Sequence, residues 1–89
     1  MGKSIHNTEY KTFIRLLRLL RESRNVTQEQ LATKLGIAQG AISKIESCER
    51  RLDLIETKSF CTALGISLVE FIVLLDKELQ NDKPQEPAN

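Results

Sequence analysis

The segment formed by residues 27–46 limits the fold more strongly than any other part of the chain. Its opening threonine can cap a short helix, and Gln30 is placed to close a capping box. Gly36 then supplies the residue type that most readily takes a left-handed conformation at a helix end. A second short helix follows, with Ile42 and Ile45 as an apolar pair on one face. The segment therefore predicts two short helices joined by a tight turn.

The second helix of this pair, residues 38–46, also carries a polar face that no hydrophobic core requires. This face begins at Ala38 and displays Gln39, Gly40, Ser43 and Lys44. In the DNA major groove, a glutamine can pair with adenine N6 and N7, and a lysine can donate to guanine O6 and N7. Such a face is typical of a DNA recognition helix. The alternatives are that Gln39 is an ordinary polar residue of a first turn and that Lys44 reaches a phosphate.

Residues 8–24 predict a helix before this pair. Its apolar stripe follows helical spacing at Phe13, Leu16, Leu17 and Leu20. Asn25 can end this helix, because asparagine tolerates the left-handed conformation. The two ends of the chain are polar: residues 1–7 are expected to be flexible, and the proline-bearing residues 81–89 are expected to form a disordered tail.

Two more helices are predicted after a loop at residues 47–52. Asp53 and Glu56 form a capping box that opens the first of them. Its inward face is expected from residues at helical spacing, which are Leu54, Thr57, Phe60, Cys61 and Leu64. Gly65 ends this helix, and a capping box of Ser67 and Glu70 opens the last one. Five helices without a strand make an all-α fold, compact enough for a single domain.

The last helix, residues 67–80, is apolar on more than one face. One face suffices for the core of a monomer and is expected from Leu68, Phe71, Ile72 and Leu75. Val69, Val73 and Leu74 are then surplus, and together they would form an exposed apolar patch. We interpret this patch as the two-fold interface of a homodimer. The alternative is burial of the whole helix within the monomer.

Charge is distributed unevenly, although the formal net charge is only +1. Residues 1–51 carry ten Lys and Arg against five Asp and Glu, a net charge of +5. Residues 52–89 carry three Lys against seven Asp and Glu, a net charge of −4. Two ordinary solvated halves could carry the same charges. Because the helix pair lies in the positive half, we interpret that half as the side that faces double-stranded DNA.

Four residues are candidates for contacts with the DNA backbone: Gln28, Arg50, Arg51 and, in the first predicted helix, Arg18. Gln28 stands at the start of the first short helix, where backbone N–H groups favour phosphate. Arg50 and Arg51 lie in the loop after the second short helix. The alternative for the two arginines is a solvated loop or an ion pair with Glu49. Phosphate contacts would set affinity and register rather than sequence preference.

The sequence offers no pattern typical of an enzyme or a metalloprotein. Its single His and two Cys, without a Cys-x-x-Cys spacing, argue against a metal site. Without a glycine-rich phosphate loop or a paired-carboxylate cleft, no catalytic residue, cofactor or small-molecule ligand is expected. No stretch is apolar enough for a transmembrane helix, and the N-terminus lacks a secretory signal. We therefore expect a cytoplasmic protein without a membrane partner.

The chain resembles the Cro/repressor-type helix-turn-helix family, also called the XRE family. The joint pattern that carries the resemblance is Gln28, Leu31, Ala32, Gly36, Ile42, Ile45 and Glu46. The resemblance spans residues 13–75 and implies a five-helix, lambda-repressor-like DNA-binding domain. It also implies a small transcriptional regulator that binds a palindromic operator as a homodimer. The alternative within the same fold is an antitoxin, a protein-interaction module that neutralises a partner protein.

The resemblance also implies roles for single residues. Gln28 is expected to bind a phosphate, while Arg21 and Glu46 match a structural pair that ties the first helix to the recognition helix. The chain departs from the family pattern at three positions. Gly40 places no side chain where relatives often read a base. Cys48 stands where a glycine is common, which can alter that turn, and Leu52 replaces a frequent proline.

Overall fold

The computed structural model describes residues 8–82, which form five α-helices and no strand. The helices are α1 (Thr8–Ser23), α2 (Gln28–Leu35), α3 (Gln39–Glu46), α4 (Leu54–Leu64) and α5 (Leu68–Asp82). The prediction of an all-α, five-helix fold is confirmed. The expected flexible segment, residues 1–7, lies outside the described residues, as do residues 83–89 of the expected tail.

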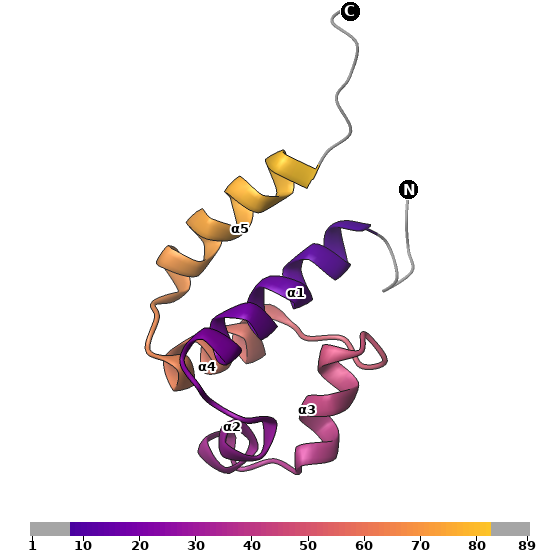
Figure 1. Cartoon of the computed structure of the whole chain (residues 1–89), viewed down its shortest axis with the longest axis vertical. Helices are drawn as coiled ribbons and strands as arrows, with labels where there is room; N and C mark the ends of the chain where they lie inside the picture. Colours follow the sequence, from indigo (N-terminus) through magenta and orange to yellow (C-terminus); the bar gives the residue numbers. More distant parts are fainter. Residues whose placement is uncertain (1–7, 83–89) are drawn as a thin grey trace, which may run out of the picture.

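α1 is the central helix of the domain. It packs against α3, α4 and α5, while α2 packs against α3 and α4. Figure 1 shows α5 running along one side of α1, with α2 and α3 together at the opposite end of the molecule. The helix pair α2 and α3 is therefore separated from α5 by the body of the domain (Figure 1).

Local capping chemistry fixes where three of the helices begin. Thr27 caps α2: its hydroxyl accepts the Gln30 N–H at 3.0 Å, and the Gln30 side chain accepts the Thr27 N–H at 2.9 Å. The same reciprocal arrangement joins Asp53 to Glu56 at α4 and Ser67 to Glu70 at α5. These bonds satisfy backbone donors that a helix start leaves open.

Left-handed residues end the helices where the sequence predicts. Gly36 follows α2 with φ +70° and Gly65 follows α4 with φ +81°. Asn25 takes φ +57° after α1. The remaining boundaries differ from expectation by one or two residues. α1 ends at Ser23 rather than at residue 24, α3 begins after Ala38, and α5 continues two residues beyond Gln80.

The core lies between all five helices, and its fully buried side chains include Phe71, Leu31 and Ile42. Cys61 is buried in it, as expected for a small core residue. Two inward assignments from the sequence are wrong. Leu54 is 60% exposed and Ile72 is 42% exposed, because both line the open groove between α1, α4 and α5 and not the closed core. Ile14, not expected in the stripe of α1, is buried instead.

No individual helix among residues 8–82 has the length and apolarity that a membrane span requires. α4 and α5 reach them only when taken together, as a pair bent by 106°.

Candidate nucleic-acid interface

α3 separates an apolar side from a polar side. Ile42 and Ile45 are buried, which fixes the helix against the core. Gln39, Gly40, Ser43 and Lys44, the predicted base-facing residues, are all exposed, as is Ala38 just before the helix. A Cβ added at Gly40 would meet no heavy atom within 4 Å, so packing does not require a glycine there. The polar face is therefore open along its whole length.

Glu46, the last residue of α3, is the centre of a hydrogen-bond network. Its carboxylate accepts two bonds from Arg21 of α1, from Nε at 2.7 Å and from Nη2 at 2.9 Å. It also accepts a bond from Gln28 Nε2 at 2.9 Å. Arg21 Nη1 in turn donates to the carbonyl of Val26 at 2.7 Å. One carboxylate thus joins α1, α2 and α3.

The ion pair between Arg21 and Glu46 is largely shielded from solvent, with side-chain exposures of 8% and 6%. The hydrogen bond to Glu46 raises the pKa of Arg21 above its ordinary value, against the opposing effect of burial. Arg21 therefore stays charged in the folded protein. The geometry agrees with the structural role that the family resemblance implies for this pair.

The network extends from Glu46 to the exposed face of α3. Gln28, the first residue of α2, is half-buried and reaches Glu46 with its Nε2. Its Oε1 accepts a long hydrogen bond of 3.5 Å from Gln39 Nε2. The first side chain of the polar face is thereby connected to the domain interior. Gln28 and Gln39 lie side by side at the starts of α2 and α3.

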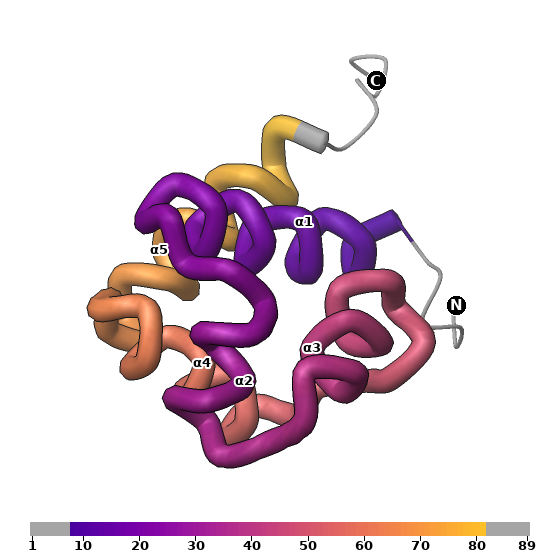
Figure 2. Tube along the Cα trace, turned by 60° about the horizontal axis from the view of Figure 1, so that its bottom comes forward, coloured from indigo at the N-terminus to yellow at the C-terminus, as the bar shows by residue number. Residues whose placement is uncertain are grey.

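The loop between α3 and α4 holds the two arginines of the predicted phosphate contacts. Arg50 Nη2 pairs with Glu56 Oε2 of α4 at 3.1 Å, and not with Glu49, the partner considered from the sequence. The Arg51 guanidinium lies 4.9 Å from the centre of the Tyr10 ring, over its face. Arg50 and Arg51 are both exposed. Figure 2 shows this loop connecting the end of α3 to α4 on the α3 side of the molecule.

Cys48 explains how the chain turns after α3. It takes φ +65°, a left-handed conformation that glycine adopts more easily. Its side chain is nevertheless 7% exposed and belongs to the core cluster. The left-handed turn is therefore kept although a side chain replaces the glycine, and the buried thiol occupies space in the core.

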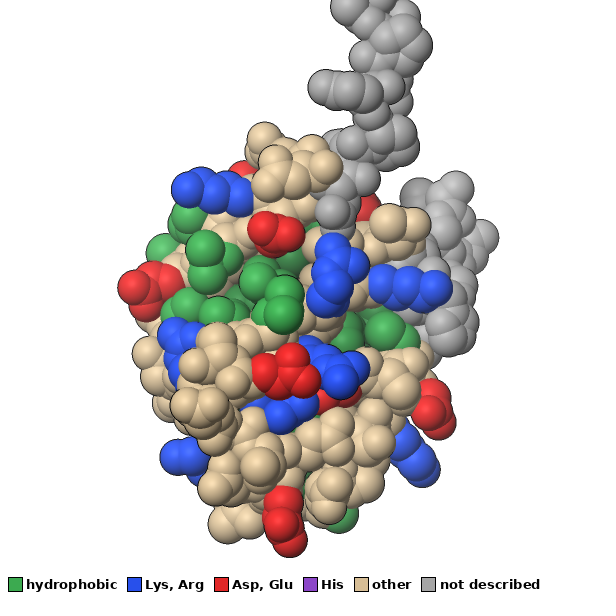
Figure 3. Space-filling model, viewed as in Figure 1, with side chains coloured by type: hydrophobic (Ala, Val, Ile, Leu, Met, Phe, Trp, Pro, Cys, Tyr) green, Lys and Arg blue, Asp and Glu red, His purple; other side chains and the backbone are tan. Residues whose placement is uncertain are grey.

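α5 presents an apolar face to solvent. Val69 is 73% exposed and Val73 is 51% exposed, and Ile72 shares their side of the helix through i, i+3 and i, i+4 spacing. Ile72 and Leu54 line one apolar groove of about 460 Å³ between α1, α4 and α5. Leu74 lies on nearly the opposite flank of α5 from Ile72, because successive helix residues are about 100° apart. In Figure 3, hydrophobic side chains gather over α5 and its border with α1.

The comparisons with known proteins agree with this geometry. Residues 17–71 match the model of the helix-turn-helix family HTH_3. The chain belongs to this family, the XRE family. No curated protein matches it. A solved XRE-family-like protein from Pseudomonas syringae pv. tomato str. DC3000 is 38% identical, with a TM-score of 0.76 over 82% of this chain and 89% of that chain.

The wild-type restriction-modification controller protein C.Esp1396I is also similar in structure. It is 26% identical, with a TM-score of 0.78 over 85% of this XRE-family chain and 99% of that chain. A point mutant of the same controller protein gives 27% identity and a TM-score of 0.80 over 86% and 100% of the two chains.

The structure of this XRE-family member also contains two contacts near the predicted interface that the sequence did not predict. Tyr10 was not considered, although it touches both Arg51 and Leu52. Glu56 was expected only as a helix cap, yet its second oxygen holds Arg50. Both contacts join residues of different elements, which helical periodicity does not reveal. Among residues 8–82, no group of three or more His, Cys, Asp or Glu side chains is arranged to hold a metal ion.

Proposed function

We propose that this XRE-family chain is a sequence-specific transcriptional regulator that binds a palindromic DNA operator as a homodimer. The observation that carries the proposal is the open polar face of α3, which is anchored from behind by Ile42 and Ile45 and from its end by Glu46. A short helix held in this way can enter the major groove without losing its packing. The likeness to a restriction-modification controller protein supports a regulatory role. A DNA target also fits the expected cytoplasmic location.

Base recognition is assigned to the exposed residues of α3. Gln39 carries a paired donor and acceptor for adenine, and Ser43 and Lys44 supply further donors one turn along the helix. Ala38 and Gly40 allow close approach of the helix to the bases but offer no polar side chain. Selectivity therefore depends on few direct contacts, and DNA shape and the spacing of two half-sites must supply the remainder.

Phosphate binding is assigned to Gln28, Arg50 and Arg51. Gln28 stands at the α2 N-terminus, where open N–H groups favour an anion. Arg50 shares one nitrogen with Glu56, but a guanidinium has five N–H donors and can bind a phosphate at the same time. Arg51 stacks on Tyr10 through its flat face, which leaves its N–H edge available.

Dimerisation is assigned to the exposed apolar face of α5. Val69, Ile72 and Val73 form its centre, and Leu54 continues it onto α4 across the shared groove. Leu74 would meet a partner only at the margin of this surface. A two-fold axis here would place two α3 helices about one DNA turn apart, roughly 34 Å, and would require a palindromic site.

A binding assay tests the proposal. Wild-type protein is used to select duplexes from a random pool, and gel shifts then compare selected and random DNA at physiological salt. We expect Gln39→Ala to reduce the preference for the selected sequence and Arg50→Ala to weaken binding to all sequences. Arg50→Ala should also lower the slope of log K against log salt by about one.

Lys58→Ala, which removes an exposed charge from α4 away from α3, is the matched control and should bind like the wild type. If the wild type binds no selected duplex more tightly than random DNA, the proposal is contradicted. If the chain instead copurifies in a stable complex with a different protein through α5, the antitoxin alternative replaces the homodimer.

A further inference from the structure

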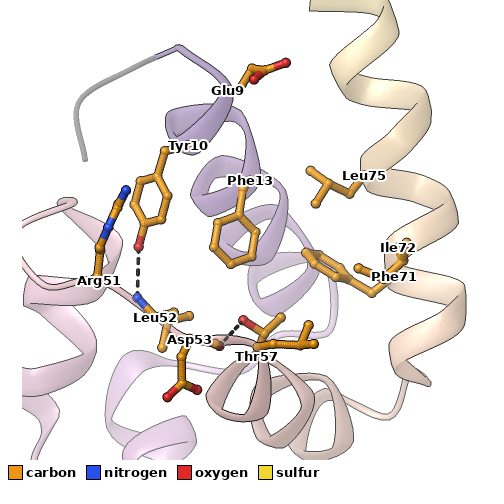
Figure 4. Close-up of a pocket in the computed structure, with 11 residues that line it drawn as sticks. Glu9, Tyr10, Phe13, Arg51, Leu52, Asp53, Thr57, Phe71, Ile72 and Leu75 are labelled. Atoms are coloured by element: carbon orange, nitrogen blue, oxygen red, sulfur yellow. Dashed lines mark hydrogen bonds between the residues drawn. The ribbon is translucent and has the colours of Figure 1, made fainter. Parts of the chain in front are cut away.

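Tyr10, in the first turn of α1, holds two consecutive residues of the loop that follows α3. Its hydroxyl accepts a hydrogen bond from the backbone N–H of Leu52 at 3.0 Å. Its ring lies under the guanidinium of Arg51, 4.9 Å from ring centre to guanidinium carbon. Figure 4 shows Arg51, Tyr10 and Leu52 together at one end of the groove.

This hydrogen bond gives a partner to the backbone N–H of Leu52. Proline at this position would carry no N–H, whereas leucine brings one into a place where its own side chain is buried. A buried backbone donor without a partner is destabilising by about 1–3 kcal/mol. The Tyr10 hydroxyl reaches Leu52 from a position 42 residues earlier in the chain. The loop is thus pinned to α1 at the residue next to Arg51.

The Tyr10 ring is itself fixed. It meets Phe13 edge to face, with ring centres 5.3 Å apart, and Phe13 meets Phe71 of α5 in the same way at 6.0 Å. Phe71 is completely buried. These three rings form a row from the core to the loop, visible in Figure 4. Arg51 therefore stacks on a ring whose position is fixed by its contacts with the core.

We propose that Tyr10 is a positioning residue for DNA binding: it holds Arg51 ready to bind a backbone phosphate. Stacking uses the flat face of the guanidinium and leaves the N–H edge for charge-assisted hydrogen bonds to an anion. Holding a long side chain in one place before binding reduces the entropy that binding would otherwise cost. The inference rests on the proposed function, because it requires that Arg51 contacts DNA.

A double-mutant cycle between Tyr10→Leu and Arg51→Ala tests this role. Arg51→Ala should weaken binding to the selected duplex about tenfold and lower the salt slope by about one. Tyr10→Leu should weaken binding in the same direction and lower the slope, although the arginine is still present. In the Arg51→Ala background, Tyr10→Leu should have no further effect on affinity. Tyr10→Phe, which keeps the ring, should retain most of the affinity of the wild type.

A purely structural Tyr10 would change the melting temperature without changing the salt slope. Additive effects of Tyr10→Leu and Arg51→Ala on affinity would overturn the inference and leave the proposed function standing. A wild type without any DNA preference would overturn both. If Tyr10→Leu does not fold, the cycle is run with Tyr10→Met and Arg51→Ala, because methionine also removes the ring on which Arg51 stacks. Amide exchange at Leu52, which should speed up in Tyr10→Phe, then shows independently whether the loop has been released.

Discussion

Arg21 and Glu46 stand 25 residues apart in the chain and meet in a two-point contact, Nε to Oε2 at 2.7 Å and Nη2 to Oε1 at 2.9 Å. This contact ties the C-terminal end of α1 to the last residue of α3. Because Gln28 donates to the same carboxylate, the orientation of the polar face depends on a charge that lies inside the domain. The stability of the fold and the position of the Gln39 side chain therefore both depend on the Glu46 carboxylate.

Removal of this carboxylate should be severely destabilising. Glu46→Ala leaves the Arg21 guanidinium buried without a counter-charge, and we expect a loss of about 3–5 kcal/mol in the free energy of unfolding. Urea denaturation measures it. The control is Arg18→Ala, which removes an exposed ion pair with Glu22 and should change stability by less than about 1 kcal/mol. Equal losses in the two variants would contradict the central role of Glu46.

Gly40→Ala should stabilise the protein. The residue lies in the first turn of α3, its added Cβ meets nothing within 4 Å, and alanine favours a helix over glycine by about 0.5–1 kcal/mol. Thermal melting of the two proteins measures the gain. Gly36→Ala is the matched comparison. Its φ of +70° strains any other residue, so it should be destabilising despite equally open space.

Val73→Glu should convert a dimer into a monomer. The substitution places a charge at the centre of the exposed face of α5, where a two-fold axis would bring it close to its own copy. Sedimentation equilibrium measures the mass. Leu19→Glu, at an equally exposed apolar residue of α1, should leave the mass unchanged. If Val73→Glu has the mass of the wild-type dimer, the interface lies elsewhere.

Stability should fall at alkaline pH in a way that Cys61 partly controls. Burial raises the pKa of the Cys61 thiol above its ordinary value of 9.0. Below that value the thiol is protonated in both states, and its contribution is fully present. Above it the unfolded chain releases a proton that the folded chain retains, so stability declines as pH rises toward the folded pKa.

The comparison is between the wild type and Cys61→Ala. Between pH 7.5 and pH 10, the free energy of unfolding should drop more in the wild type than in Cys61→Ala. Identical pH profiles would show that the thiol ionises equally in both states.

Local signals in the sequence predicted the helix boundaries well. The capping boxes at Thr27, Asp53 and Ser67 and the glycines at 36 and 65 act within a few residues, so their chemistry can be read directly from the sequence. The exposure of single side chains was harder to predict from the sequence. Leu54 and Ile72 occupy positions at helical spacing, but only the placement of the neighbouring helices decides whether such an edge is covered.

Contacts between distant segments were predicted only where the family pattern supplied them. The Arg21–Glu46 pair came from the resemblance, and its geometry agrees. Nothing in the sequence connects Tyr10 with Leu52, since the contact depends on how α1 crosses the loop. Leu52 was visible in the sequence as a departure from the family pattern, but the partner of its N–H depends on the fold.

The empty space beside Gly40 has a consequence for how this protein can change. At a closely packed position, a larger side chain disturbs its neighbours and can destabilise the fold. Gly40 is not such a position. Its neighbour Gln39 is hydrogen-bonded to Gln28, but no atom lies within 4 Å of a Cβ added at Gly40. Under the proposed function, one substitution at Gly40 would therefore add a side chain that can contact bases while the packing of the domain stays the same.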